Sequence, residues 1–152
     1  MDIVFAEEQL QHVLEEMKPM LLEHWEEVAM YKDKIDFSPD YNKYFSMCDM
    51  GFIRLYTMRD NGKLVGYSLF FTMPHLHYSK DMFAVNDVVF VDPEYRLPFI
   101  TPAFFNYVEE QLSRLGMSVI TYHMKVYKPF EKLMNGLQYN FTEHLYTKYI
   151  RD

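Results

Sequence analysis

One stretch near the middle of the chain restricts the fold more than any other. The apolar run FAVNDVVFV (83–91) is typical of a buried strand, and VDPEYRLPFI follows as a tight loop. A helix is predicted from about Pro102 to Leu115, with Gly116 as its stop and SVITYHM (118–124) as the next strand. This stretch therefore predicts a β-α-β unit, which needs a sheet with a helix packed against it.

The segment before this unit predicts an antiparallel meander. FIRLYTM (52–58) and KLVGYSLFF (63–71) are strand candidates joined by the turn signal Asp60-Asn61-Gly62. Gly66 is expected to mark a bulge. TMPHLHYSKD (72–81) is interpreted as a loop in which Pro74 ends the pairing.

The two ends of the chain complete the predicted order. DIVFA (2–6) is a short strand, and Pro19 is expected to divide the following apolar pattern into two short helices. Lys128 to Leu137 is a weak helix, and YNFTEHLYTKYI (139–150) closes the chain as one long or two short strands. This order predicts one α/β (α+β) domain over residues 1–152, with a mixed, mostly antiparallel central sheet and helices on both faces.

Charge is concentrated at the amino-terminal end. Residues 1–31 hold eight acids and one base, and so carry −7, the net charge of the whole chain. This argues against direct binding to duplex nucleic acid, which needs phosphate neutralisation. The segment is either a solvated helix face or a surface for a basic protein patch. Cys48 is the only cysteine, and no apolar run approaches the ~18 residues of a membrane span, so we expect a soluble, cytoplasmic protein.

The element order, with VDPEYR joining strand to helix, resembles the GNAT family of N-acetyltransferases, and more narrowly the small GNAT-like proteins of tailed phages. The matching pieces lie between about residues 50 and 150: NGKLVGYSLFF, HLHYSK, NDVVFVDPEYR, YVEEQLSRLG, YHMKV and HLYTKYI. The resemblance implies acetyl-CoA, or another acyl-CoA, as donor and an amine of a protein or small molecule as acceptor. A phage origin would place the protein in the host cytoplasm.

The family's phosphate loop is degenerate in this chain. Its pattern, Q/R-x-x-G-x-G/A, binds pyrophosphate through backbone N–H groups at a helix N-terminus. Here Arg96 matches, Phe99 and Thr101 occupy the glycine places, and Pro98 has no N–H. Thr101 is expected to cap the helix. The resemblance implies a cofactor-binding set of Phe90, Val91, Arg96, Leu97, Phe99, Ile100 and Thr101.

Asp87 and His123 are the predicted catalytic residues. A carboxylate within the apolar NDVVFV is costly unless it is paired or functional, so Asp87 is either a general base or a structural hydrogen-bonding acid. His123 lies on the strand expected to pair loosely with that of Asp87, and could pass a proton or fill the core. His77 and Tyr78 match the phage proteins and imply an acceptor pocket. His75 and His77 lack the further ligands that a metal site needs.

The family's tyrosine, which protonates the leaving thiolate, is missing. Its place falls on Met134, or on Glu131 or Lys132 in a second register. Two functions follow. The first is N-acetyl transfer assisted by Asp87. The second is a catalytically inactive GNAT-fold binding protein, such as a phage inhibitor of a host protein acting through its acidic N-terminal helices. The sequence does not fix the oligomeric state, and a dimer is compatible with it.

Overall fold

The computed structural model describes residues 1–151. Within them it has strands β1 (Ile3–Glu8), β2 (Ile53–Asp60), β3 (Lys63–His75), β4 (Tyr78–Val91) and β5 (Met117–Thr121). The helices are α1 (Leu10–Val28), α2 (Tyr41–Asp49), α3 (Ile100–Arg114) and α4 (Glu131–Gly136), with a short 3₁₀ turn η1 (Pro93–Tyr95).

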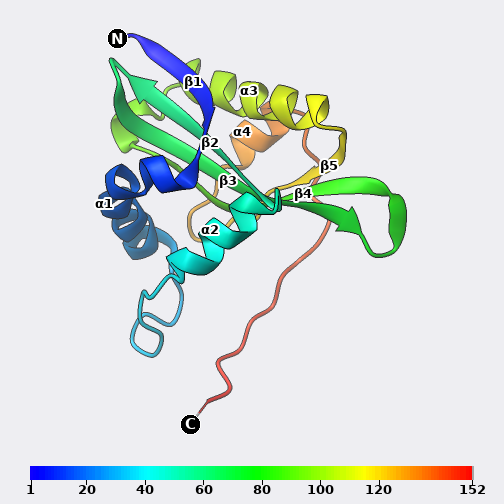
Figure 1. The fold of residues 1–152 in the computed structure, drawn as a ribbon. Coiled ribbons are helices and arrows are strands. Elements are labelled where there is room, and N and C mark those ends of the chain that lie inside the picture. The colour runs from blue at the N-terminus through cyan, green and yellow to red at the C-terminus, as the bar shows by residue number, and fades with distance from the viewer. Residues whose placement is uncertain (152) are drawn as a thin grey trace.

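The strands form one sheet in chain order, β1-β2-β3-β4-β5 (Figure 1). β1 to β4 pair antiparallel, whereas β5 pairs parallel to β4 after the crossover through α3. The predicted mixed, mostly antiparallel sheet with helices on both faces is therefore confirmed. Gly66 pairs with Met58 beside a register shift, which agrees with the predicted bulge. A Cβ at Gly66 would come within 2.9 Å of the Met58 side chain and 3.2 Å of the Phe90 carbonyl.

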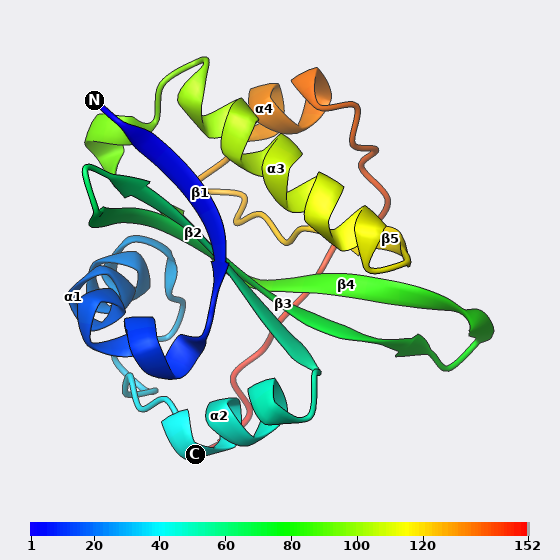
Figure 2. The same ribbon diagram turned by 45° about the horizontal axis from the view of Figure 1, so that its top comes forward.

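Each face of the sheet has its own apolar core. α3 and α4 lie on one side of the sheet, and α1 and α2 lie on the other (Figure 2). Side chains alternate between faces along a strand, so neighbouring residues enter different cores. Phe90 packs with the α1 side chains and Val91 with those of α3. The end of β4 is thus fixed from both sides, and this is where the candidate site lies.

The prediction of two short helices before residue 31 is wrong, because α1 continues through Pro19 as one helix. Proline inside a helix costs about 3 kcal/mol through its missing N–H and a clash. The apolar stripe continues past it, with Met17 buried and Met20 and Leu21 packed against the same core. Burial on both sides of the proline offsets that cost. The second helix of the structure is instead α2. The pattern KDKIDFSPDYNKY (32–44) indicates a polar connection with room for one helical turn, whereas α2 begins within it at Tyr41 and continues to Asp49.

The predicted loop at residues 72–81 is also wrong. β3 and β4 continue as a long hairpin, in which Pro74 is in register with Met82. A register shift between Pro74 and His75 accommodates the missing N–H. The hairpin extends beyond the rest of the sheet (Figures 1 and 2), and Leu76 at its tip is 97% exposed.

The predicted closing strands are absent, because residues 139–151 form no helix or strand. The segment instead runs away from β5 towards the connection between α1 and α2 (Figure 1). There the Tyr149 and Tyr31 rings lie 6.0 Å apart, and the hydroxyls of Tyr31 and Thr147 are 3.3 Å apart.

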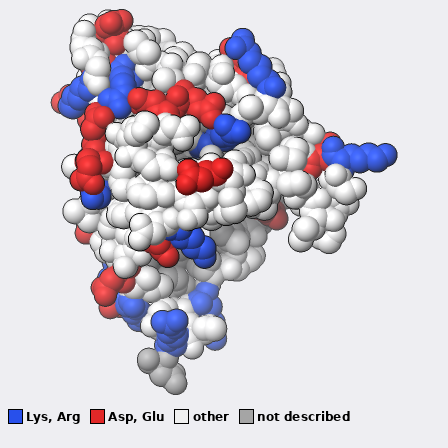
Figure 3. Space-filling view, viewed as in Figure 1, with Lys and Arg blue, Asp and Glu red and all other residues white. Residues whose placement is uncertain are grey.

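Acidic side chains of residues 1–31 are mostly paired with bases. Salt bridges join Glu7 to Arg54, both Glu8 and Glu16 to Arg59, Glu15 to Lys18, Glu26 to Lys32 and Glu27 to Arg96. Acidic and basic atoms accordingly lie side by side on this part of the surface (Figure 3). No helix among the described residues is long and apolar enough to cross a membrane.

Candidate active site

The site lies where β4 and β5 separate. β5 pairs with β4 only along residues 82–85, so residues 86–91 of β4 have β3 as their only neighbouring strand. After β5, Tyr122 enters the α3 core, with its ring 5.0 Å from that of Phe105 and 5.4 Å from that of Phe70. β4 therefore presents one open backbone edge, to which an extended ligand can hydrogen-bond.

A β-bulge places Asp87 in this opening. Leu69 is in register with Val88 and Phe70 with Asn86, so Asp87 is the extra residue of the bulge. The buried Asn86 amide nitrogen lies 3.1 Å from Ser68 Oγ and from the carbonyl oxygens of Leu69 and Val88. These contacts satisfy polar groups that the bulge would otherwise leave unpaired, and so fix its shape.

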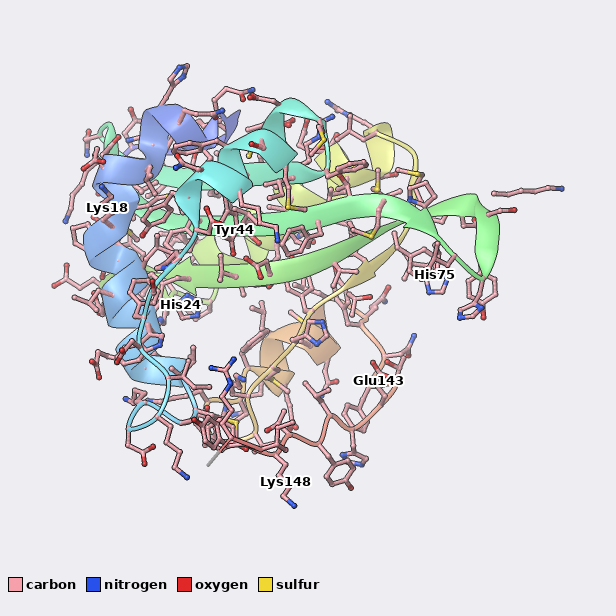
Figure 4. The ribbon with its side chains drawn as sticks, turned by 60° about the horizontal axis from the view of Figure 1, so that its bottom comes forward. Lys18, His24, Tyr44, His75, Glu143 and Lys148 are labelled. Carbon is pink, nitrogen blue, oxygen red and sulfur yellow. The ribbon has the colours of Figure 1, made fainter. Side chains whose placement is uncertain are left out.

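Tyr44 is the hydrogen-bond partner of Asp87. Its hydroxyl donates to Asp87 Oδ2 at 2.7 Å, and its ring stacks at 6.5 Å on Phe71. Figure 4 shows Tyr44 reaching from α2 to the sheet. Asp40 caps α2 by accepting from the Lys43 N–H at 3.0 Å. The capped helix thus positions the phenol over the bulge.

The surroundings of Asp87 change its acidity. The residue is solvent-accessible, yet packing around its carboxyl raises its pKa, and the Tyr44 hydrogen bond partly opposes that rise. Burial, together with Asp87, also raises the pKa of Tyr44. Tyr44 therefore acts as a neutral hydrogen-bond donor, and Asp87 is a stronger base than an ordinary surface aspartate.

A small cavity of about 150 Å³ adjoins this pair. Its lining comes from α2 and β3 and is mainly apolar: Asp40, Lys43, Tyr44, Met47 and Phe71. It is smaller than the ~300–1,000 Å³ of sites that enclose a whole ligand. It can therefore hold no more than one arm of a larger molecule, and Tyr44 is the member of the pair that lines it.

Arg96, which matched the family pattern, is engaged within the protein. Its Nε donates to the Val91 carbonyl at 2.7 Å, and its two terminal nitrogens donate to the Glu27 carboxylate at 3.0 and 2.9 Å. Its guanidinium also lies 5.3 Å from the centre of the Phe90 ring. The pair lowers the pKa of Glu27, which keeps that carboxylate charged beside the loop.

Two backbone N–H groups of the loop remain available. Leu97 donates to the Tyr95 carbonyl at 2.8 Å and Thr101 to the Leu97 carbonyl at 3.2 Å. Phe99 and Ile100 begin α3 without a backbone acceptor anywhere in residues 1–151. The predicted capping role of Thr101 is wrong: the helix begins at Ile100, and the Thr101 hydroxyl donates to the Tyr95 carbonyl at 3.3 Å.

The side chains of the cofactor-binding set do not converge on one point. Phe90, Val91 and Ile100 are buried, so only their backbone atoms can meet a ligand. Leu97 packs against the α3 core, and Phe99 is 69% exposed. A phosphate at this loop would therefore meet the N-terminus of α3 and two N–H groups, without an arginine side chain.

The other predicted site residues lie apart from Asp87 or lack a contact with it. His123 is exposed beyond the end of β5, and no hydrogen bond joins it to Asp87 within residues 1–151. His77 and Tyr78 lie at the hairpin tip, where His75 packs 4.9 Å from the Tyr78 ring (Figure 4). Asp87 lies nine residue steps along the extended strand from Tyr78, which is about 30 Å at ~3.3 Å per step. The tip does not reach the bulge.

Sequence reasoning missed Tyr44 and His24. Tyr44 lies 43 residues from Asp87 in a segment interpreted as a connection. The signal available was Asp40 followed by YNKYF, a capped helix start with aromatics. His24 lies in α1, with Nδ1 3.3 Å from the Tyr67 hydroxyl, and burial lowers its pKa. It supports Phe90, with ring centres 5.4 Å apart.

No tyrosine occupies the family's general-acid place in α4. Tyr139 follows that helix, but its hydroxyl donates to Glu109 at 3.2 Å. Tyr146 is exposed on the C-terminal segment. In residues 1–151 no group of three or more His, Cys, Asp or Glu side chains is arranged to hold a metal ion.

No protein-family model and no curated protein matches this chain. Solved structures do. An aminoglycoside acetyltransferase from an uncultured soil metagenomic sample, in complex with sisomicin, has a TM-score of 0.72 at 11% identity, covering 98% of this chain and 95% of that one. A ribosomal-protein-alanine N-acetyltransferase from Brucella melitensis biovar Abortus has a TM-score of 0.74 at 14% identity, with 100% and 98% covered.

A third structure, titled a predicted acetyltransferase, comes from Clostridium acetobutylicum and contains acetyl-CoA. It has a TM-score of 0.68 at 9% identity, with 97% of this chain and 96% of that one covered. Identities this low establish an arrangement of elements and not a reaction. With the five-stranded sheet that opens between β4 and β5, they show that this chain has the GNAT acetyltransferase fold.

Proposed function

We propose that residues 1–152 form one N-acetyltransferase domain, which transfers the acetyl group of acetyl-CoA to an amine. The observation that carries this proposal is the bulge of β4. It places a carboxylate of raised pKa, hydrogen-bonded to Tyr44 at 2.7 Å, at the open end of a splayed sheet of this fold. We infer that the protein acts in the cytoplasm, where acetyl-CoA is found.

Acetyl-CoA supplies a thioester carbonyl and a thiolate leaving group. The groups that fit it are the N–H of Val91, which faces the open edge of β4, and the N–H groups of Phe99 and Ile100 at the start of α3. The Val91 carbonyl already accepts from Arg96 Nε, and the backbone of Phe90 faces Tyr67 of β3. Hydrogen bonds to a charged phosphate contribute ~1.5–3 kcal/mol each. Because only two such donors remain, we expect weaker binding than a glycine-rich loop would give.

Asp87 is the proposed base. An alkyl ammonium with a pKa near ~10.4 must lose a proton before its nitrogen can attack. The Asp87 carboxylate takes that proton, directly or through water, and the nitrogen forms a bond to the carbonyl carbon as the carbon–sulfur bond breaks. After the attack the nitrogen carries one proton more than the amide product, and that proton passes through water to the departing thiolate, whose thiol has a pKa near ~8.5. Tyr44 holds Asp87 in place.

The acceptor enters from the α2 side. The cavity beside Tyr44 fits an alkyl arm of a larger molecule, and its two charged lining residues, Asp40 and Lys43, are of opposite sign. Two structural neighbours name acceptor classes worth assaying. These are an aminoglycoside, with sisomicin as the probe, and a protein N-terminal amine, with an alanine-initiated peptide as the probe.

Calorimetry with acetyl-CoA, followed by a free-thiol assay with each acceptor, tests the proposal. Acetyl-CoA should bind with a micromolar to submillimolar Kd, raise the melting temperature and release CoA only when an acceptor is present. A folded protein that binds no acetyl-CoA at millimolar concentration contradicts the proposal.

A second function, a GNAT-fold binding protein without turnover, is favoured by the phosphate loop itself. Arg96 is held by Glu27, Pro98 lacks an N–H, and Leu97 and Thr101 donate to carbonyls. A phage protein of this kind would inhibit a host protein, and the acidic N-terminal segment, with its single helix α1, is the surface proposed for that contact. The same calorimetry separates the two functions, since only the first requires acetyl-CoA.

A further inference from the structure

The β5–α4 loop, from Tyr122 to Phe130, has both of its ends on one side chain of α3. Tyr122 and Phe130 pack on Phe105, with ring centres 5.0 and 6.4 Å away. Between them the chain runs past the sheet towards the end of α1 and then returns to α4 (Figures 1 and 2). There the Tyr127 hydroxyl donates to the carbonyl of Val28, the last residue of α1. The loop is therefore held at both ends and near its tip.

The contact with α1 places Lys128 beside the phosphate loop. Glu27, the residue before Val28, holds the Arg96 fork with both of its carboxylate oxygens. The Arg96 hydrogen bond lowers the pKa of Glu27, and the nearby charge of Lys128, the residue after Tyr127, lowers it further. Lys128 itself is exposed and forms no salt bridge within the described part of the chain. Its ammonium is thus available to an anion that binds at this loop.

An anion at the phosphate loop needs a further cation, because the charged side chains around the loop are mostly acidic. Asp92 and Glu94 lie immediately before it, at η1, and Glu27 lies on its α1 side. Arg96 can offset only one of these three carboxylates, and its fork is already occupied. A pyrophosphate adds more negative charge to the same place. Without another cation, the backbone N–H groups would have to hold it against this repulsion.

We propose that Lys128 binds the pyrophosphate of the acyl donor in place of Arg96, so that the protein selects acyl donors that carry this group. The inference rests on the proposed function only in requiring that acetyl-CoA binds at the start of α3. A lysine ammonium is a point charge with three donors on a flexible stem, so it can meet phosphate oxygens without the fixed geometry of an arginine fork. Because the Tyr127 contact holds the backbone, only the lysine side chain has to turn.

Calorimetry with three probes tests the inference: acetyl-CoA, inorganic pyrophosphate, and acetyl-pantetheine, which lacks the pyrophosphate. Lys128→Gln should weaken the binding of acetyl-CoA and of pyrophosphate about tenfold, which corresponds to one charge-assisted hydrogen bond. Acetyl-pantetheine should bind the wild-type protein and Lys128→Gln alike. Lys128→Arg keeps the charge and should keep most of the affinity. Tyr127→Phe releases the loop from α1 and should weaken acetyl-CoA binding several-fold.

Lys125→Gln is the matched control, since it makes the same charge change on the same loop. It should leave all Kd values unchanged, and circular dichroism should be the same for all the lysine variants, because Lys125 and Lys128 are exposed. Unchanged acetyl-CoA binding in Lys128→Gln overturns the inference and leaves the proposed function standing. An equal loss in Lys125→Gln, or a parallel loss for acetyl-pantetheine, overturns it too.

The same measurements separate this inference from the proposed function. If acetyl-CoA binding depends on Lys128 but no acceptor leads to thiol release, acetyl transfer is wrong and the role of Lys128 stands. If the folded wild-type protein binds neither acetyl-CoA nor pyrophosphate at millimolar concentration, both are overturned.

Discussion

The two sides of the β4 opening use their polar groups in different ways. On the α2 side, Asp87 has one hydrogen-bond partner, Tyr44, and remains solvent-accessible beside a small cavity. On the loop side, Arg96 has its whole guanidinium fork occupied by Glu27 and the Val91 carbonyl. The first side keeps a group that can accept a proton. On the second side, the arginine that the family resemblance assigns to phosphate is a structural link between α1 and β4.

Under the proposed function, this difference teaches that the two halves of one site can diverge separately. A bulge and a capped helix fix the α2 side, and both are local features of the backbone. The loop side depends on side chains and N–H groups, which single replacements can redirect. A protein with this pattern is expected to keep proton-transfer chemistry longer than tight cofactor binding.

Asp87→Asn gives the largest expected effect on turnover. An amide cannot accept the amine proton, so turnover should fall on the order of 100-fold or more, the usual contribution of a general base. The Kd for acetyl-CoA should stay within twofold by calorimetry, because that ligand is expected to contact backbone atoms of the loop and β4. Asp81→Asn, on the same strand but far from the bulge, is the matched control. Parallel loss of binding and turnover would make Asp87 a structural residue.

Glu27→Gln should tighten the binding of acetyl-CoA at the loop. The replacement removes a charged carboxylate beside the loop and releases the Arg96 fork, whose bidentate geometry suits phosphate. One charged hydrogen bond at the lower end of the ~1.5–3 kcal/mol range predicts that acetyl-CoA binds about tenfold more tightly. Because the pair is partly exposed, stability should fall by less than about 1 kcal/mol.

Glu26→Gln, whose partner is Lys32 and not Arg96, is the control and should leave the Kd unchanged. Calorimetry with acetyl-CoA on both variants compares their Kd values. If Glu27→Gln binds acetyl-CoA no better than the parent, the pair is not what weakens the loop.

The sequence was sufficient where signals are local and agree with one another. FAVNDVVFV, VDPEYR and the amphipathic run ending at Gly116 predicted β4, the turn and α3. Polar–apolar periodicity predicts such helices and strands, because burial of one face against the core determines which secondary structure forms. It also placed Asp87 as an acid within an apolar strand, although it could not show the bulge that makes Asp87 accessible.

The failures have identifiable physical causes. Pro19 predicts a helix boundary, but packing of α1 on both sides of it outweighs the local cost. Pro74 predicts the end of strand pairing, but a register shift accommodates it. Tyr44 and Glu27 act through partners 43 and 69 residues away, and no local pattern predicts such contacts. Tertiary contacts decided each of these points.

Tyr44→Phe gives the smallest expected effect on turnover, and it tests whether the Tyr44 hydroxyl sets the pKa of Asp87. The Tyr44 hydroxyl lowers the pKa of Asp87 against the rise caused by burial, so its removal should raise that pKa further. A base works only when deprotonated, and the acidic limb of the rate–pH profile should therefore move to higher pH. Turnover should fall several-fold on that limb and stay nearly unchanged on the plateau. Tyr41→Phe, on the same helix, should leave the profile in place. An acidic limb that stays in place in Tyr44→Phe has two explanations: another group accepts the proton, or the hydrogen bond is not formed during turnover. A second rate–pH profile, measured on Asp87→Glu, separates them. If the acidic limb moves in Asp87→Glu, residue 87 is the base.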